Sequence, residues 1–148
     1  MISIDTTIIG TKSEIHRVFR IVDELASDYC LSADVVADMN VALDEVLTNI
    51  ITHGYSDSGS HEIRIRFSLD QCNLTVEVED DGKPFNPLTA PPPDLKGSAK
   101  ARRDGGVGIH FVKNLMSEVA YSFVDNRNRL VIRKNLGSKN KGVINEPT

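Results

Sequence analysis

The sequence predicts an α+β fold of two layers, an α/β sandwich whose mixed, mostly antiparallel sheet is covered on one face by helices. Apolar residues spaced three and four apart predict helices, and two adjoining stretches of strict alternation predict a strand hairpin. The elements also lack the regular strand–helix alternation that builds a parallel sheet. The 148 residues, 40% hydrophobic and 26% charged, suit one domain with its own core.

The first half of the chain predicts one strand and two helices. Residues 1–9 mix isoleucines with serine and threonine, a composition that predicts a strand. A helix capped by Thr11 or Ser13 follows and closes within 28–31. Ser32 caps a second, longer helix that ends at Gly54, a typical residue for the position after a helix. Their apolar stripes are Ile15, Val18, Phe19, Val22 and Leu25, then Val35, Met39, Leu43, Val46, Leu47, Ile50 and Ile51.

The second half predicts two hairpins with a helix between them. Residues 61–69 and 74–80 alternate apolar and polar side chains and are joined by a loop at 70–73. A third helix follows the glycines at 105–106. The last hairpin pairs 119–124 with 129–134, turning through 125–128, and residues 136–148 are expected to form a flexible tail.

Composition limits the classes of function. Seventeen Lys and Arg against 21 Asp and Glu give a net charge of −4, which disfavours nucleic-acid binding. Neither a targeting segment nor a membrane-spanning run is visible, so a cytoplasmic protein without a membrane partner is expected. Cys30 and Cys72 have no metal-binding pattern, although a single disulfide between them stays open.

Glu45 and Asn49 are the first candidates for chemistry. Four residues apart on the long helix, they share one face. Such a pair usually belongs to a solvated polar stripe. Alternatively, it combines a carboxylate base with an amide oxygen able to ligate Mg²⁺.

Asp80 is the second candidate. By strand parity it shares the inward face of Leu74, Val76 and Val78. It is either a strand end where parity no longer matters, or an acceptor for a ligand N–H, because a buried carboxylate needs a donor. Gly82 would let a flat ligand approach the backbone.

The third candidate is the run Gly105, Gly106, Val107, Gly108 and Ile109, which opens the third helix. It is either a hinge or a phosphate cradle at a helix N-terminus. Residues 86–104, rich in proline and then in basic residues, lead directly into this run. They are either a solvated loop or a lid over the candidate phosphate site.

Together these stretches resemble the GHKL (Bergerat-fold) ATPase superfamily, and within it the stand-alone anti-sigma-factor serine/threonine kinases of bacterial partner-switching systems. The resemblance is carried by the helix 39–49 with His53-Gly54-Tyr55, by Asp80-Asp81-Gly82-Lys83-Pro84-Phe85, and by 105–109 with 115–119. It covers about residues 1–135, expected to form a histidine-kinase-like ATP-binding domain with an ATP lid at about 87–104.

The resemblance implies a role for each matching residue. Glu45 would orient or deprotonate the attacking hydroxyl, and Asn49 would bind Mg²⁺. Asp80 would accept the adenine amino N–H, and Gly82 would line the adenine pocket. The run 105–109 would cradle the phosphates of ATP, with Gly106 and Gly108 closest. Where many relatives carry a hairpin threonine that supports the aspartate, this sequence has Asn128 and Arg129.

The resemblance also implies partners. Family members phosphorylate a serine or threonine of a STAS-domain anti-sigma-factor antagonist, many hold a sigma factor, and relatives often dimerise, so a homodimer is an open alternative. A second hypothesis is a non-enzymatic module that binds ATP and sequesters a sigma factor or another partner. A histidine-kinase catalytic domain is disfavoured, because 148 residues leave no space for phosphoacceptor helices.

Overall fold

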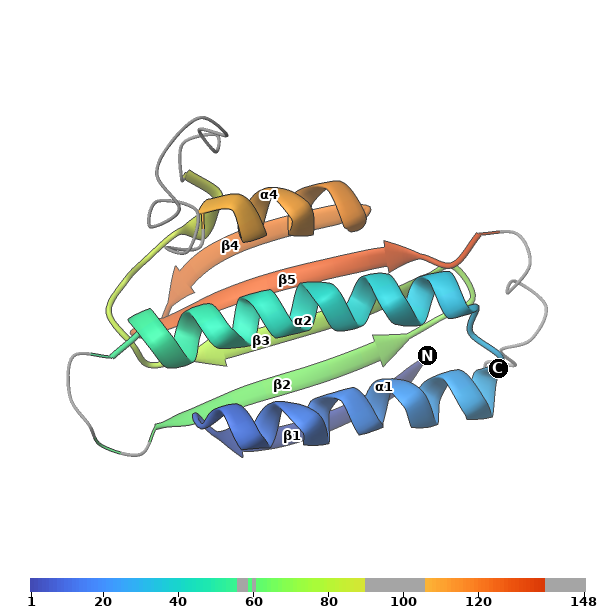
Figure 1. The fold of residues 1–148 in the computed structure, drawn as a ribbon, viewed down its shortest axis with the longest axis horizontal. Helices are drawn as coiled ribbons and strands as arrows, with labels where there is room; N and C mark the ends of the chain where they lie inside the picture. The colour runs from blue at the N-terminus through green and yellow to red at the C-terminus, as the bar shows by residue number, and fades with distance from the viewer. Residues whose placement is uncertain (56–58, 60, 90–105, 138–148) are drawn as a thin grey trace.

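The computed structural model describes residues 1–55, 59, 61–89 and 106–137. Within them a five-stranded sheet has the order β1-β2-β3-β5-β4 (Figure 1). Its strands are β1 (Ile2–Ile9), β2 (Glu62–Leu69), β3 (Asn73–Asp80), β4 (Glu118–Val124) and β5 (Arg127–Asn135). Every pair of neighbouring strands is antiparallel, so the predicted sheet is confirmed, without the parallel pairs that a mixed sheet would contain.

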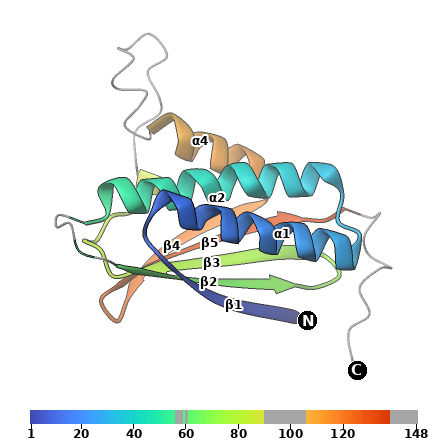
Figure 2. The same ribbon diagram turned by 60° about the horizontal axis from the view of Figure 1, so that its bottom comes forward.

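The helices form a second layer on one face of the sheet, as predicted (Figures 1 and 2). This layer consists of the short η1 (Lys12–Glu14), α1 (Ile15–Tyr29), α2 (Ala33–His53) and α4 (Gly106–Leu115), while a short turn of helix, η2 (Pro87–Thr89), follows β3. In Figure 1, α2 runs between α1 and α4 across the middle of the sheet. The long helix predicted to carry Glu45 is therefore central.

The core lies between the two layers and follows the two periodicities of the sequence. Alternate residues of β2 and β3 are buried, and the apolar stripes of α1 and α2 face them. The largest fully buried side chains include Phe67, Met39, Leu43 and Leu47. This packing holds α2 against the sheet.

The other face of the sheet carries charged side chains from neighbouring strands. Arg66 pairs with Asp5 across β2 and β1 at 2.7 Å, and Arg129 pairs with Glu79 across β5 and β3 at 2.6 Å. Cross-strand pairs of opposite charge suit a face that water can reach. A hollow of about 310 Å³ on this face is lined by these same side chains and holds none of the predicted site residues.

One predicted helix end, the N-terminal cap of the first helix, differs from its prediction. Ser32 caps α2 as expected, its Oγ accepting from the Val35 N–H at 3.2 Å. Thr11 and Ser13 make no such cap, because their hydroxyls bond each other at 3.1 Å. The closing residue Cys30 has a left-handed φ of 55°, and no disulfide joins it to Cys72.

The last hairpin differs from its prediction in a way that affects the site. Its turn needs only Asp125 and Asn126, whose φ angles are 54° and 61°. Arg127 and Asn128, predicted in the turn, therefore belong to β5. Leu136, predicted in the flexible tail, is buried, and its N–H donates to the Cys72 carbonyl at 2.8 Å. Residues 138–148 of that tail lie outside the described residues.

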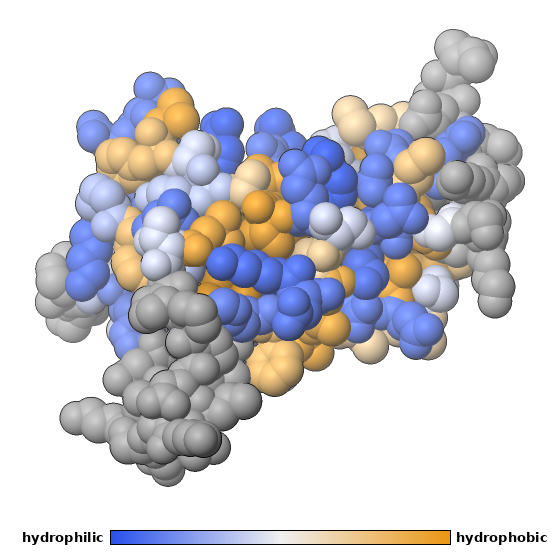
Figure 3. Space-filling model, turned by 90° about the horizontal axis from the view of Figure 1, so that it is seen from above, coloured by the Kyte–Doolittle hydropathy of each residue, from blue (hydrophilic) through white to orange (hydrophobic). Residues whose placement is uncertain are grey.

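Within the described ranges, no helix has both the length and the apolar character needed to cross a membrane. Seen from the side of α4, the surface mixes apolar and charged side chains (Figure 3). Phe111 on α4 is among the exposed large hydrophobic residues.

Candidate active site

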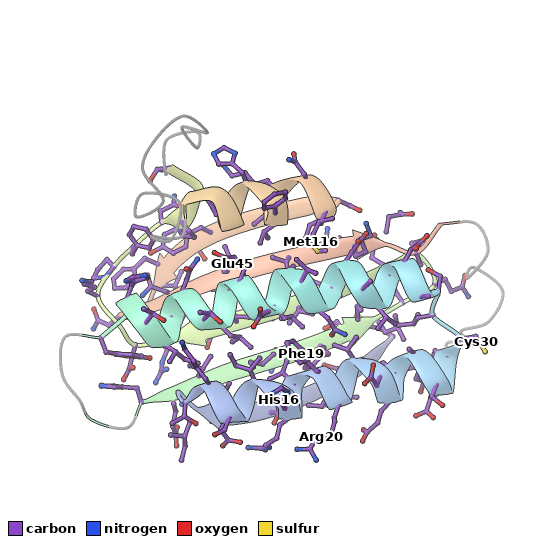
Figure 4. All side chains as sticks on the ribbon, in the orientation of Figure 1. His16, Phe19, Arg20, Cys30, Glu45 and Met116 are labelled. Atoms are coloured by element: carbon purple, nitrogen blue, oxygen red, sulfur yellow. The ribbon has the colours of Figure 1, made fainter. Side chains whose placement is uncertain are left out.

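The C-terminal half of α2 supplies Glu45 and Asn49, which are both partly buried. Neighbouring positions Val46 and Leu47 are core residues, and their packing fixes the rotation of the helix. As a result Glu45 lies on the side of α2 that faces α4, as Figure 4 shows. The two predicted residues therefore do not belong to an open solvated stripe.

The Glu45 carboxylate lies directly against Gly108 of α4. A Cβ atom built on Gly108 would lie 1.9 Å from Glu45 Cδ and 1.9 Å from its Oε1. Any side chain at this position would displace the carboxylate. The two motifs, far apart in the sequence, thus meet where α4 begins beside α2.

Burial raises the pKa of the Glu45 carboxyl above its ordinary value, because desolvation disfavours the charged form. A hydrogen bond with the Asn49 side chain acts against this rise, and the charge of Asp44 adds to it. A raised pKa makes a carboxylate a better proton acceptor. The pair can therefore serve as a base and its orienting neighbour.

Asp80 ends β3 with only 5% of its surface exposed, in agreement with its predicted inward parity. Its Oδ1 accepts the Gly82 N–H at 2.9 Å and the Asn128 amide at 3.1 Å. Burial raises the pKa of Asp80, and these two hydrogen bonds lower it. A buried carboxylate with donors on one oxygen is suited to accept a further N–H.

Gly82 packs against the end of α2. A Cβ atom here would lie 2.4 Å from the Gly54 carbonyl oxygen and 2.9 Å from Asp80 Oδ1. The same carbonyl accepts the Lys83 N–H at 3.1 Å. The turn after β3 and the C-terminus of α2 are therefore held together.

The other residues of the predicted phosphate cradle differ in whether the structure describes them and in how far they are buried. Gly105 lies outside the described residues, whereas Gly106 and Val107 begin α4. The side chain of Ile109 is buried in the core, so only its backbone is available to a ligand. Of the predicted lid at 87–104, residues 87–89 form η2 and the others lie outside the described residues.

Two contacts at this site were not predicted, whereas Asn128 had been named only as standing where many relatives carry a threonine that supports the aspartate. Asn128 bonds Asp80, Tyr121 bonds Asn128, and Lys113 donates to the Leu88 carbonyl at 3.0 Å, tying η2 to α4. The burial of Asn128 could have been predicted, because it alternates along the strand with Leu130 and Ile132, which are also buried. Nothing in the sequence pointed to the Tyr121 or Lys113 contacts.

The family described as the histidine kinase-like ATPase domain matches residues 10–134. The chain belongs to this family. The resemblance to GHKL kinases is thus confirmed, and Glu45, Asn49, Asp80, Gly82 and Gly108 all fall within the matched part of the histidine kinase-like ATPase domain.

Curated relatives of this histidine kinase-like domain are named as kinases and anti-sigma factors. A serine-protein kinase RsbW of Listeria monocytogenes is 28% identical over 99 residues, which are 64% of this chain and 63% of that protein. An anti-sigma F factor of Clostridium novyi is 29% identical over 111 residues, 70% of this chain and 73% of that one. The chain thus matches just under two thirds of the length of the RsbW relative.

Solved structures share the fold. The RsbU and RsbW domains of Rv1364c from Mycobacterium tuberculosis match 92% of this chain and 33% of that one, with a TM-score of 0.65 and 17% identity. The histidine kinase domain of the blue-light activated kinase from Erythrobacter litoralis has a TM-score of 0.52 and 18% identity, covering 91% of this chain and 65% of that one. At these identities the likeness establishes the architecture alone.

Proposed function

We propose that this chain is an ATP- and Mg²⁺-dependent protein serine/threonine kinase of a bacterial partner-switching system. Its substrate is a serine or threonine of a STAS-domain anti-sigma-factor antagonist, and it also sequesters a sigma factor. The observation that carries the proposal is the Glu45 carboxylate, partly buried beside Asn49 and packed against Gly108. A domain that only binds a nucleotide needs no base at this position.

Each site residue has a role in this proposal. ATP would supply the γ-phosphoryl group, which passes to the substrate hydroxyl as ADP leaves, and Mg²⁺ held with the help of Asn49 would offset the negative charge of the phosphates. Glu45 accepts the proton of the attacking hydroxyl. Asp80 accepts the adenine amino N–H, Gly82 lines the adenine pocket, and the backbone from Gly106 to Gly108 donates to the phosphates at the start of α4.

The described residues suit a Mg²⁺ ion that is bound partly by the protein and partly by the phosphates of ATP. No group of three His, Cys, Asp or Glu side chains in the described ranges could hold a metal ion. Mg²⁺ commonly uses one or two protein oxygens together with substrate phosphates. The Asn49 amide oxygen, one turn from Glu45, fits such a single ligand.

Partners follow from the same family assignment. The relatives named RsbW and anti-sigma F factor support a substrate antagonist and a sigma factor as partners. A cytoplasmic location follows from these partners, and a homodimer is compatible with the proposal. Neither nucleic acid nor a membrane takes part.

The test is phosphotransfer from γ-labelled ATP and Mg²⁺ to the STAS-domain proteins of the source organism. We expect acid-stable label on one of them, as for phosphoserine. Glu45→Ala should slow transfer about 100-fold, the lower range for loss of a general base, and Asn49→Ala should also slow it. Transfer at the parent rate in Glu45→Ala would show that Glu45 is not the base.

The alternative is a non-enzymatic anti-sigma module, which the relative named anti-sigma F factor favours. In that case ATP would bind, no label would be transferred, and a partner would bind tightly only with nucleotide present. Acid-labile label on a partner would instead indicate a histidine kinase.

The transfer rate should depend on pH through Glu45. Only the ionised carboxylate accepts a proton, and burial raises the pKa of Glu45. At saturating ATP, kcat should therefore fall as the solution is acidified, with a midpoint above the ordinary glutamate value of about 4.3. The residual rate of Glu45→Gln should lack this decline, and an identical decline in that variant would assign it to another group.

A further inference from the structure

A lysine, Lys134, occupies an inward position near the end of β5. It continues the alternation of the buried residues Leu130 and Ile132, so its side chain lies on the face of the sheet that the helices cover. Only 20% of that side chain is exposed. A cation in such a place is costly unless its charge and its donors are satisfied. The partners of Lys134 therefore indicate what it does.

Lys134 joins two helices through its ammonium group. Its Nζ lies 2.7 Å from Asp38 Oδ2 on α2, and it donates at 2.6 Å to the carbonyl of Leu115, the last residue of α4. That carbonyl belongs to the group that a helix leaves without partners at its C-terminus, where a cation is also favourable. An apolar side chain at position 134 would satisfy neither partner.

The contact of Glu45 with Gly108 is a second point at which α2 and α4 meet. Asp38 precedes Glu45 by seven residues on α2, and Gly108 precedes the last residue of α4 by seven as well. The two helices run in opposite directions, so the two contacts have the same spacing on both (Figure 1). Seven residues are about two turns, or about 10 Å of helix. Together the two contacts hold α4 at one position along α2.

Other contacts of α4 constrain this position less. Ile109 and Val112 are buried in the core, but the burial of apolar surface is not directional and does not by itself stop a helix from shifting along its neighbour. Lys113 donates to the Leu88 carbonyl of η2, and the Ser117 N–H after α4 donates to a carbonyl of β5. Neither of these hydrogen bonds reaches α2.

We propose that Lys134 is a positioning residue for phosphotransfer. By joining the end of α4 to Asp38, it fixes where α4 lies along α2, and so where Gly108 lies relative to Glu45. This inference rests on the proposed function, because it takes Glu45 as the base and the start of α4 as the phosphate cradle. Lys134 acts through the two helices and not on a reacting atom.

The first arm of the experiment measures kcat of phosphotransfer at saturating ATP. Lys134→Met removes the charge and the donors but keeps an unbranched side chain, and it should lower kcat about tenfold, less than the roughly 100-fold cost of a misplacement by about 1 Å. Lys134→Arg keeps a cation with donors for both partners and should restore most of the rate. Arg133→Met is the matched control, because it breaks an ion pair between β5 and Glu118 of β4, and it should leave kcat unchanged.

The second arm uses NMR of the nucleotide-free protein and needs no phosphotransfer. In the parent, Glu45→Gln changes the group packed against Gly108, so the amide resonance of Gly108 should shift. In Lys134→Met, where α4 is no longer held at its end, the same substitution should shift this resonance much less. Sites about 10 Å apart normally act independently, so a lost response shows coupling through α4. A lysine that only stabilised the fold would lower Tm and leave the response intact.

A milder variant and the remaining outcomes complete the test. Asp38→Asn keeps the hydrogen bond from Lys134 to α4, should fold normally, and should lower kcat about threefold, the effect of one weakened ion pair. An unchanged kcat in this variant would overturn the part of Asp38. If Lys134→Met transfers phosphate at the parent rate, or its Gly108 resonance responds as in the parent, the inference is overturned. If the parent transfers no phosphate although Gly108 responds as expected, the proposed function fails, and the role of Lys134 in phosphotransfer fails with it.

Discussion

Gly108→Ala should slow phosphotransfer about 1,000-fold while leaving the protein folded. The new methyl group would lie 1.9 Å from the Glu45 carboxylate, so that the side chain must swing away. Misplacing a reacting group by about 1 Å costs about 100-fold in rate, and the methyl group would also crowd the backbone donors at the start of α4. Because the atoms in conflict are the end of a flexible side chain, the fold can adapt. Single-turnover phosphotransfer with thermal unfolding alongside measures both effects.

Two further variants test whether the slower transfer by Gly108→Ala comes from its contact with Glu45. Gly10→Ala is the matched control, because its Cβ would meet no atom closer than 3.4 Å. Adding Glu45→Ala to Gly108→Ala should slow transfer little further, since residues in contact are not additive and the contribution of Glu45 is already lost. If Gly108→Ala transferred phosphate at a rate within threefold of that of the parent, the contact between Gly108 and the Glu45 carboxylate would be contradicted.

Gly82→Ala should instead damage the fold and the site together. Its Cβ would lie 2.4 Å from the Gly54 carbonyl oxygen, a backbone atom at the end of α2 that cannot rotate away. Overpacking of this kind costs about 3 kcal/mol in free energy of unfolding, which lowers Tm by about 10 °C for a chain of this size. The shift would also press on Asp80 Oδ1, 2.9 Å from the same Cβ. ATP affinity should therefore fall as well.

Urea unfolding and ATP titration measure the two consequences of Gly82→Ala. Gly10→Ala is again the matched control, because it adds the same methyl group without a backbone clash. An unfolding midpoint equal to that of the parent would mean that the turn after β3 can move away from α2. In that case the close packing of Gly54 and Gly82 would not be required for stability.

The secondary structure and the inner faces could be predicted from the sequence because they depend on local periodicity. The alternation in 61–69 and 74–80 places Ile65 and Val78 on the inner face, and the structure buries both. The same parity placed Asp80 among apolar neighbours. Glu45 and Asn49 share one face because they are four residues apart on a helix.

The residue at which the turn of the last hairpin ends and β5 begins could not be predicted from composition. Asp125, Asn126 and Asn128 are all residues typical of turns. Only two residues are needed when both take a positive φ, and this choice depends on the pairing of β5 with both neighbouring strands. Asn128 is thereby moved from an expected loop to the position opposite Asp80.

The sequence by itself determined the two layers, the identity of the acidic candidates and the faces on which they lie, because these follow from spacing along one element. Only the tertiary structure decided which elements meet. The contact of Glu45 with Gly108, the packing of Gly54 on Gly82 and the hydrogen bonds from Tyr121 through Asn128 to Asp80 each join different elements. Such contacts depend on how side chains fill the space between packed elements, which no local pattern along the chain records.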